Sequence, residues 1–262
     1  ERGVKYISTR TIGADHIDLT AAKELGLKVC NSNYAPNGVA DYTVMLILLS
    51  LRKYKPALWR AQVNDYSLAG LQGRELRNLT VGILGTGKIG AAVIKNLSGF
   101  GCRILASDIR ENPSLKGLCT YVDNETLYKE CDIISLHMPL LESTRHFVNA
   151  ETIARMKDGV TIINCARGEL MNIPDMIRGI ETQKIGALAL DVFDKEDGIY
   201  HENRRDDILS NRDMAYLRQF PNVIMTQHMA FYTDAAVQSM VFCGIEGLCD
   251  FAKTGHTETE LV

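Results

Sequence analysis

The sequence has little proline and no excess of charge of either sign. Its 262 residues include 6 prolines, 21 glycines and a single tryptophan, a composition that excludes disordered, collagen-like and coiled-coil chains. The formal net charge is −3 at pH 7, so a basic surface for a polyanion is not expected, and neither is a nucleic-acid partner. At this length the chain forms one large domain or two, with enough apolar residues for a sizeable core.

The sequence also lacks paired cysteines and a long apolar run. Its seven cysteines stand apart without a CxxC pair, which favours reduced core thiols over a disulfide framework or a zinc site. The longest apolar run, residues 44–51, is far shorter than the ~20 residues of a membrane span. A signal peptide is not evident either. We therefore expect a cytoplasmic protein without a membrane partner.

Short β-branched runs alternate with amphipathic stretches along the chain. The pattern predicts strands at residues 4–9, 27–30, 80–84, 102–107, 133–136, 160–164, 186–190 and 222–226. It predicts helices at residues 18–25, 37–53, 87–100, 124–130, 150–156, 173–181 and 233–254. Strands separated by helices form parallel βαβ units. We therefore predict an α/β fold with a doubly wound parallel sheet of the Rossmann type, and we interpret the charge-rich residues 194–213 as a solvated loop.

The strongest local motif is a glycine-rich turn, GTGKIG at residues 85–90, between a predicted strand and a predicted helix. Gly85 permits the tight turn, Gly87 lets a pyrophosphate approach the backbone, and Gly90 lets helix and strand pack closely. Asp108 ends the next predicted strand about 20 residues further on, where an acidic residue binds a ribose 2′-hydroxyl and repels a 2′-phosphate. The pattern predicts NAD as the coenzyme, although Arg110 leaves NADP open.

Three further predicted strands each end near a side chain that suits the reduction of a 2-keto acid. Arg167 follows the first of them, and a guanidinium group binds a carboxylate through two hydrogen bonds. Glu196 follows the second strand and His228 the third. Because the carboxyl ends of parallel strands face one crevice, we expect these side chains to converge. They would supply a carboxylate anchor, a group that holds the proton donor, and the donor itself.

Two residues near these strand ends have more than one interpretation. His137 ends the predicted strand at 133–136, where it suits either a place beside a nicotinamide ring or a structural role. Cys165 lies beside Arg167 and has the position of a nucleophile. Since no histidine adjoins it in the sequence, a reactive thiol is the less favoured interpretation.

Taken together, these motifs resemble the D-2-hydroxyacid dehydrogenase family over nearly the whole chain. The resemblance is carried by Asp108 and by residues 13–18, 85–90, 137–139, 164–168, 191–196 and 228–233. Within the family, residues 228–233 are similar to D-lactate and D-2-hydroxyisocaproate dehydrogenases. The resemblance implies NAD-dependent reduction of a small 2-keto acid, with pyruvate as the favoured substrate and D-lactate as the product.

The resemblance also implies a role for each site residue. Arg167 would bind the substrate carboxylate, His228 would donate a proton to the keto oxygen, and Glu196 would orient His228 and favour its protonated form. The coenzyme would also contact Lys88, Ile89, Met138, Pro139, Thr144, Cys165, Ala166 and Asp191. The substrate would be bordered by Ile12, Gly13 and Tyr34.

The chain departs from the family pattern at several positions. Gln227 stands where a proline usually precedes the catalytic histidine, Asp194 replaces a more usual Glu, and Asn172 replaces a common Asp. We expect Gln227 to loosen the approach to His228 without abolishing its role. Complete members have a further α/β stretch before Val4, so we expect the substrate-side domain to be only half present and the chain alone to be a poor enzyme.

These expectations divide the chain into a dinucleotide-binding domain at residues 35–230 and a partial, flavodoxin-like substrate domain at residues 1–34 and 231–262. The stretch from Val39 to Leu51 is more apolar than one buried face requires. It predicts a homodimer interface, with an internal core helix as the alternative. The alternatives for the function are another D-2-hydroxyacid dehydrogenase, acting on 2-hydroxyisocaproate, glycerate or 3-phosphoglycerate, and a non-enzymatic NAD-sensing scaffold of the same fold.

Overall fold

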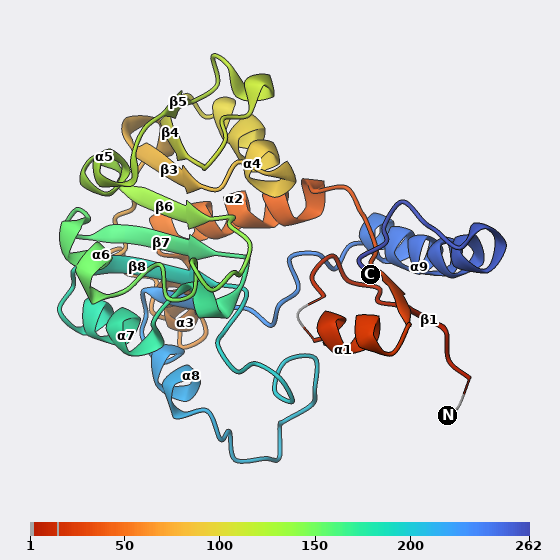
Figure 1. The fold of residues 1–262 in the computed structure, drawn as a ribbon. Helices are drawn as coiled ribbons and strands as arrows, with labels where there is room; N and C mark the ends of the chain where they lie inside the picture. The colour runs from red at the N-terminus through yellow and green to blue at the C-terminus, as the bar shows by residue number, and fades with distance from the viewer. Residues whose placement is uncertain (1–2, 15) are drawn as a thin grey trace. The chain divides into compact units, whose positions relative to one another are not determined.

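The computed structural model describes residues 3–14 and 16–262, which form two compact units. Unit 1 consists of Glu1–Gly38 and Phe231–Val262, and unit 2 consists of Val39–Ala230. Figure 1 traces the chain through both units. The assignment of the units to a substrate domain and a coenzyme domain stays a prediction.

Unit 2 is built on a parallel seven-stranded sheet with the strand order β5-β4-β3-β6-β7-β8-β9. Its strands are β3 (Thr80–Leu84), β4 (Arg103–Ser107), β5 (Thr120–Tyr121), β6 (Ile133–Leu136), β7 (Val160–Asn164), β8 (Ile185–Leu190) and β9 (Val223–Met225). The strand order reverses between β3 and β6, so connections leave this point in opposite directions. Open α/β sheets bind their ligands at such a switch point. The predicted doubly wound fold is confirmed.

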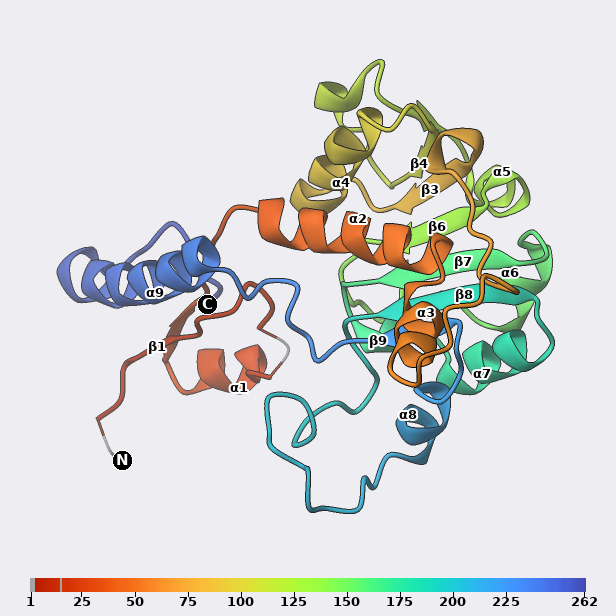
Figure 2. The same ribbon diagram turned by 180° about the vertical axis from the view of Figure 1, so that it is seen from behind.

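Helices cover both faces of this sheet. Figures 1 and 2, taken from opposite sides, show α2 and α4 on one face and α5, α6 and α7 on the other. The helices of the unit are α2 (Asn37–Leu51), α3 (Tyr54–Ala61), α4 (Lys88–Ser98), α5 (Asn124–Glu130), α6 (Ala150–Arg155), α7 (Ile173–Glu181) and α8 (Arg212–Leu217). The core lies between these layers, where β6 and β7 are buried along their whole length.

Side-chain caps fix several helix starts in unit 2. Asp123 begins α5 by accepting from the backbone N of Thr126 at 2.7 Å, and Asn172 begins α7 by accepting from the backbone N of Asp175 at 3.2 Å. The asparagine at position 172 is thus tolerated because its side-chain oxygen caps the helix as a carboxylate would. At α4, by contrast, the first residue outside the helix is Gly87, and among the described residues no side chain caps this end.

Unit 1 contains a parallel pair of short strands, β1 (Tyr6–Ser8) and β2 (Lys28–Cys30), connected through α1 (Leu19–Glu24). The long helix α9 (Asp234–Thr254) packs on this pair. The rings of Tyr6 and Phe251 stack with their centroids 5.5 Å apart. Gly247 lies so close to Cys30 that a Cβ on the glycine would come within 2.7 Å of the sulfur. Aromatic stacking and close backbone approach therefore hold α9 to the strands.

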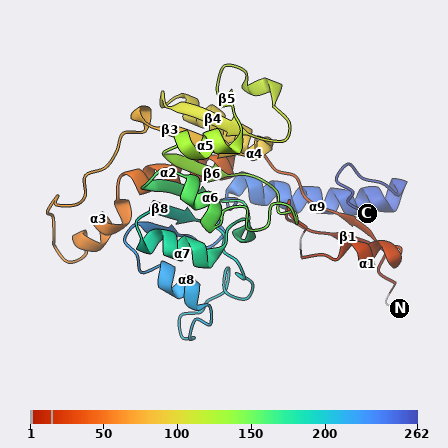
Figure 3. The ribbon, with the colours of Figure 1, turned by 60° about the vertical axis from the view of Figure 1, so that its left-hand side comes forward.

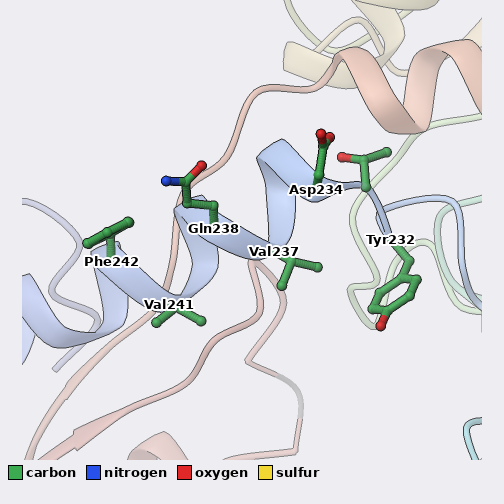
Figure 4. Close-up of a pocket in the computed structure, with 7 residues that line it drawn as sticks. Tyr232, Asp234, Val237, Gln238, Val241 and Phe242 are labelled. Atoms are coloured by element: carbon green, nitrogen blue, oxygen red, sulfur yellow. The ribbon is translucent and has the colours of Figure 1, made fainter.

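Another side of α9 remains open. Figure 4 shows Val237 and Val241 pointing to one side of this helix and Gln238 and Phe242 to the other, beside a hollow of about 500 Å³. By length and composition alone, α9 is the single helix in the described part of the chain that could cross a membrane. The expectation of no membrane span rested on the shorter apolar run at residues 44–51 and did not consider this helix. Packing on β1 and β2 accounts for its buried residues, such as Met240 and Phe251, while Phe242 and Ile245 are exposed.

Candidate active site

The glycine-rich turn lies where β3 ends and α4 begins. Gly85 has φ +94°, and a Cβ at this position would lie 2.8 Å from the carbonyl oxygen of His137. A Cβ on Gly90 would lie 2.0 Å from the carbonyl oxygen of Gly85, so only glycine lets α4 pack on the turn. Gly87 differs, because apart from its chain neighbours no described residue has an atom within 4 Å of its Cβ position. The space beside Gly87, at the first turn of α4 with Lys88 and Ile89, is open to a pyrophosphate.

Asp108 lies just beyond the end of β4, next to the glycine-rich turn. Its Oδ2 accepts from the backbone N of Thr86 at 2.5 Å and from Thr86 Oγ1 at 3.1 Å, and its Oδ1 accepts from the backbone N of Arg110 at 3.2 Å. Partial burial raises the pKa of this carboxyl, but the hydrogen bonds outweigh burial and hold the pKa below its ordinary value. Asp108 is therefore ionised and fixed in orientation.

The loop after β6 borders the same switch point and carries Met138 and Pro139. Thr144 folds this loop back on itself, since its Oγ1 donates to the carbonyl oxygen of Pro139 at 2.7 Å and accepts from the backbone N of Leu141 at 2.8 Å. The predicted coenzyme residues Met138, Pro139 and Thr144 thus belong to one compact turn.

His137 joins the end of β6 to the end of β3. Its backbone N donates to the carbonyl oxygen of Leu84 at 2.7 Å, and its Nε2 lies 2.8 Å from the hydroxyl of Ser135. Burial lowers the pKa of His137 to about 4, so the ring is neutral near pH 7. A neutral, hydrogen-bonded ring fits a structural role, and a place beside the nicotinamide stays a prediction.

Arg167 lies in the turn after β7, and Asn164 holds that turn. Asn164 is fully buried at the end of β7. Its Nδ2 donates to the carbonyl oxygen of Arg167 at 2.8 Å, and its Oδ1 accepts from the backbone N of Ala166 at 2.9 Å. This function of Asn164 was not predicted, although the residue belongs to the motif at 164–168 and a buried asparagine at a strand end often shapes a turn.

Gly168 packs the arginine turn against the loop that follows β8. A Cβ on Gly168 would lie 2.1 Å from the carbonyl carbon of Phe193, so the two backbones are in direct contact. Phe193 in turn donates its backbone N–H to Glu196 Oε2 at 2.7 Å. The turn that carries Arg167 and the loop that carries Glu196 are thereby fixed relative to each other.

Glu196 and His228 form a hydrogen-bonded pair between the loops that follow β8 and β9. Glu196 Oε1 bonds Nδ1 of His228, while Oε2 accepts from Phe193. The two side chains are 22% and 28% exposed, so the pair is shielded but reachable. The carboxylate holds Nδ1, so Glu196 fixes the direction of the His228 ring.

Asp191 is a buried carboxylate that shapes the turn of His228. It is 0% exposed. Its Oδ1 accepts from Thr226 Oγ1 at 2.6 Å and from the backbone N of Met229 at 3.0 Å, and its Oδ2 accepts from the backbone N of Ala230 at 2.8 Å. Its carbonyl oxygen accepts from the backbone N of His228 at 2.6 Å. This supporting function of Asp191 was not predicted, and its contact with the coenzyme stays a prediction.

Cys165 is a buried thiol within the arginine turn. Burial raises its pKa to about 12, so it stays protonated and is a poor nucleophile. All seven cysteines are free thiols.

Ile12, Gly13 and Tyr34, the predicted substrate contacts, belong to unit 1. Thr11 Oγ1 donates to the carbonyl oxygen of Gly13 at 2.5 Å, and Asn31 Nδ2 donates to that of Ile12 at 2.7 Å. These bonds shape the turn at residues 12 and 13, while Tyr34 is half-buried. The contacts of all three residues with a substrate stay predictions.

The described residues of unit 2 fit a dinucleotide. Gly87 leaves room beside the first turn of α4, and a helix N-terminus attracts phosphate. The ionised Asp108 stands at the end of the neighbouring strand, as a ribose-binding carboxylate does. A dinucleotide there, a guanidinium group and a carboxylate–imidazole pair are the parts needed to reduce a carbonyl next to a carboxylate.

Comparisons with known proteins agree with this geometry. The family described as D-isomer specific 2-hydroxyacid dehydrogenase, NAD binding domain, matches residues 44–230. An aromatic 2-oxoacid reductase of Clostridium sporogenes is 44% identical over 262 residues, covering 99% of this chain and 79% of that protein. A D-lactate dehydrogenase of Lactobacillus delbrueckii subsp. bulgaricus is 37% identical over 261 residues, covering 99% of this chain and 78% of that protein.

The fold is also similar to that of solved enzymes. The NAD-complexed structure of a D-isomer specific 2-hydroxyacid dehydrogenase from Lactobacillus delbrueckii ssp. bulgaricus superposes with a TM-score of 0.88 at 33% identity, covering 99% of this chain and 80% of that one. The family resemblance and the prediction of NAD are both confirmed. The chain therefore belongs to the family of D-isomer specific 2-hydroxyacid dehydrogenases, and its coenzyme is NAD.

Proposed function

We propose that the protein reduces a small 2-oxo acid to the D-2-hydroxy acid with NADH, and that pyruvate is its preferred 2-oxo acid. The observation that carries this proposal is the Glu196–His228 pair, which is held on the same sheet as the glycine-rich turn. A shielded carboxylate–imidazole pair of this kind is suited to moving a proton to or from a bound acid, although an NAD-sensing scaffold of the same fold can also retain it.

The residues of this chain take separate parts in the proposed reaction. NADH, when bound, supplies the hydride for the carbonyl carbon. Arg167 binds the substrate carboxylate through its planar guanidinium group. His228 donates the proton on Nε2 to the keto oxygen as negative charge develops there, and Glu196 holds Nδ1 so that the ring keeps its tautomer and direction. In the opposite direction His228 accepts the proton of the hydroxy acid.

A second candidate substrate is an aromatic 2-oxo acid such as phenylpyruvate. It is favoured by the 44% identity to the aromatic 2-oxoacid reductase, against 37% for the D-lactate dehydrogenase. Tyr34, which is expected to border the substrate, is aromatic, and Phe231 and Tyr232 of the same unit form an edge-to-face pair whose centroids lie 6.0 Å apart. Substrates of D-2-hydroxyisocaproate dehydrogenases lie between these two in size.

The test is NADH oxidation with pyruvate, 2-oxoisocaproate and phenylpyruvate, using this chain and any longer form of the polypeptide. Product handedness is read by chiral chromatography. His228→Ala should lower kcat by about 10²- to 10⁴-fold, because a general acid is lost. His256→Ala is the matched control, since that ring pairs with Glu260 at 3.0 Å in unit 1 and is exposed.

Each outcome separates two functions. The relative kcat/KM values rank pyruvate against the aromatic acid. If NADH binds and no 2-oxo acid is reduced in either form, the NAD-sensing function replaces the proposed one. Full activity of His228→Ala would instead leave the oxidoreductase class standing and remove His228 as the proton donor.

We also propose that two copies of the chain form a homodimer through α2, α3 and the segment that follows. Most apolar side chains of α2 are buried in unit 2 itself, so the available surface is narrower than the sequence indicated. The outer side of α2 and α4 leaves an apolar hollow of about 680 Å³ that includes Met45, Leu48 and Phe100.

The segment after α2 adds a second apolar surface to this proposal. Figure 3 shows α3 and the residues after it extending from unit 2. Lys55 anchors α3 by donating to the carbonyl oxygens of Arg218 and Phe220, each at 2.7 Å. Beyond it, large apolar side chains are exposed, among them Val63 at 74% and Leu68 at 83%. Large exposed apolar patches usually mark an interaction site.

Light scattering of the purified protein tests the dimer. Met45→Glu combined with Leu68→Glu should give a monomer, because each change places a charge on the proposed interface. Ile208→Glu is the control, since Ile208 is 97% exposed on the charged loop. A dimer that survives the double change would contradict this interface. A cytoplasmic location stays a prediction, supported by the free thiols.

A further inference from the structure

An oriented chain of hydrogen bonds stands behind the carboxylate of Asp108. The backbone N of Asn112 donates to the hydroxyl of Tyr121 at 2.8 Å. That hydroxyl lies 2.9 Å from Thr86 Oγ1, which lies 3.1 Å from Asp108 Oδ2. Tyr121 comes from the edge strand β5, and Thr86 lies between the first two glycines of the glycine-rich turn.

The chemistry of the donors fixes the direction of this chain. A backbone N–H only donates, so the Tyr121 oxygen accepts from Asn112. An ionised carboxylate only accepts, so Thr86 gives its hydroxyl proton to Asp108. The remaining proton, on the Tyr121 hydroxyl, therefore points at Thr86 Oγ1. Every hydroxyl both accepts and donates, and bonds aligned in this way strengthen one another.

The backbone of Thr86 is held by the same partners. Its N–H donates to Asp108 Oδ2 at 2.5 Å, and its carbonyl oxygen accepts from Asn112 Nδ2 at 3.2 Å. Thr86 is only 3% exposed. The residue between Gly85 and Gly87 is thus fixed at its N–H, its carbonyl and its hydroxyl, so the turn and Asp108 keep one mutual orientation.

We propose that Tyr121 is a positioning residue for the coenzyme. Through Thr86 it directs Asp108 toward the ribose hydroxyls and keeps the turn open beside Gly87 for the pyrophosphate. The inference rests on the coenzyme part of the proposed function and is independent of which 2-oxo acid is reduced. It adds to the description of the coenzyme site a residue, Tyr121, that influences the choice between NADH and NADPH and need not touch the coenzyme.

Discrimination between NADH and NADPH follows from the same contacts. The bonds from Thr86 hold Asp108 Oδ2 in place, so the carboxylate is kept from turning away from a 2′-phosphate. Without the Tyr121 hydroxyl, Thr86 Oγ1 loses a donor and Asp108 gains rotational freedom. NADH then binds more weakly, and the repulsion of NADPH is relaxed. Arg167, Glu196 and His228 stand on other strands, so the proton-transfer step is not affected.

Tyr121→Phe tests the proposal, because it removes one hydroxyl and keeps the ring. NADH dissociation constants are measured by coenzyme fluorescence, and kcat and KM by NADH oxidation. We expect the dissociation constant and KM for NADH to rise about 3- to 10-fold, the span of one hydrogen bond, with kcat retained. The preference for NADH over NADPH should fall as well. Tyr216→Phe is the matched control, since that tyrosine loses a single bond to Glu181 of 2.8 Å at α8.

Variants of Thr86 separate positioning from packing. Thr86→Val removes the hydroxyl at nearly constant shape and should weaken NADH binding at least as much as Tyr121→Phe, because it also removes the bond to Asp108. The double variant should bind NADH no more weakly than Thr86→Val, because both changes interrupt the same series of hydrogen bonds. Thr86→Ser keeps the hydroxyl and should bind NADH more tightly than Thr86→Val. The melting temperature of the free protein is measured alongside.

Two results would overturn the proposal: wild-type NADH affinity in Tyr121→Phe, or additive losses in the double variant. If the proposed function were wrong, a different result would be seen: NADH would bind, but no 2-oxo acid would be reduced. In that case the dissociation constants still decide the role of Tyr121.

Discussion

His201 Nε2 lies 3.0 Å from the carbonyl oxygen of His228, and the centroids of the two rings are 6.1 Å apart. The contact links the loop that follows Glu196 to the turn that carries the proposed proton donor. Tyr200, the residue before His201, donates its backbone N–H to the carbonyl oxygen of Glu196 at 3.0 Å. His201 therefore connects both members of the Glu196–His228 pair through one short turn.

We expect His201→Phe to lower kcat by about 2- to 10-fold, the worth of one hydrogen bond, while KM for NADH stays the same. The phenyl ring keeps the bulk of the side chain and removes the bond to His228. Steady-state kinetics with the best 2-oxo acid measures the change, beside His146→Phe as a control of equal chemistry on another loop. Equal kcat values for His201→Phe and wild type would show that this contact does not guide His228.

Alanine substitutions at two glycines of the glycine-rich turn should have different effects, one on stability and the other on NADH binding. Gly90→Ala places a Cβ 2.0 Å from the carbonyl oxygen of Gly85 and should cost about 1–3 kcal/mol or more of unfolding free energy. Gly87 has φ −63° and open space at its Cβ position, so Gly87→Ala should fold normally. It should bind NADH at least tenfold more weakly, because the methyl group occupies the place of the pyrophosphate.

Urea unfolding and NADH fluorescence on both variants measure these effects. Gly99→Ala, at the far end of α4, serves as the control, because its nearest neighbour to a Cβ is an ordinary contact of 3.8 Å. A Gly87→Ala protein with intact NADH affinity would show that the pyrophosphate lies elsewhere.

His137 should make the fold less stable as the pH falls from about 6.5 to about 4. Its pKa is about 4 in the folded protein and is near 6.5 in an unfolded chain. Within this window the unfolded chain binds the extra proton, so stability is complete above pH 6.5 and is lost toward pH 4. The loss reaches roughly 3 kcal/mol at most. Carboxyl groups with lowered pKa values, such as Asp108 and Asp132, lose their contributions at more acidic pH.

Urea unfolding at several pH values between 4 and 7 measures this effect. His137→Gln carries no titrating group and should give a flatter profile than wild type. His146→Gln, which changes an exposed histidine, should keep the wild-type slope. Identical slopes for wild type and His137→Gln would mean that the ring is protonated in the folded protein.

Cys165 should resist alkylation in the native protein. Its pKa of about 12 and its burial leave almost no thiolate near pH 7, whereas Cys249 is exposed. Peptide mass spectrometry after brief iodoacetamide treatment should find Cys249 modified first and Cys165 modified only in urea. Native labelling of Cys165 as fast as that of Cys249 would restore the nucleophile interpretation.

Much of the fold was predictable because buried strands and amphipathic helices have different periods. The predicted strands at 80–84, 133–136 and 160–164 have the observed bounds. Helix α3 was missed because no glycine or proline separates it from α2, which ends at Leu51. The chain turns at Lys53, whose φ of 49° is unusual for a lysine and cannot be predicted from the residue type. Helix α8 was missed because its buried face consists of only Met214 and Leu217, next to a charge-rich loop.

The site was predictable where it depends on strand ends and was hidden where it depends on contacts between distant segments. The Glu196–His228 pair follows from two parallel strands that share a sheet edge. The close approach of Gly168 to Phe193 and the bond from Tyr121 to Thr86 join residues 25 and 35 positions apart. Such pairs carry no local pattern, so only the folded chain reveals them.

The glycine-rich turn, Arg167 and the Glu196–His228 pair all belong to unit 2, which is one uninterrupted stretch of chain. An uninterrupted stretch can be moved between genes with two cuts, without dividing the residues to which we assign hydride and proton transfer. We expect that grafting this stretch between the flanking segments of a relative would change which acid is reduced while the manner of reduction is inherited intact. On the proposed assignment, the reacting groups and the substrate contacts would belong to separate parts of one polypeptide.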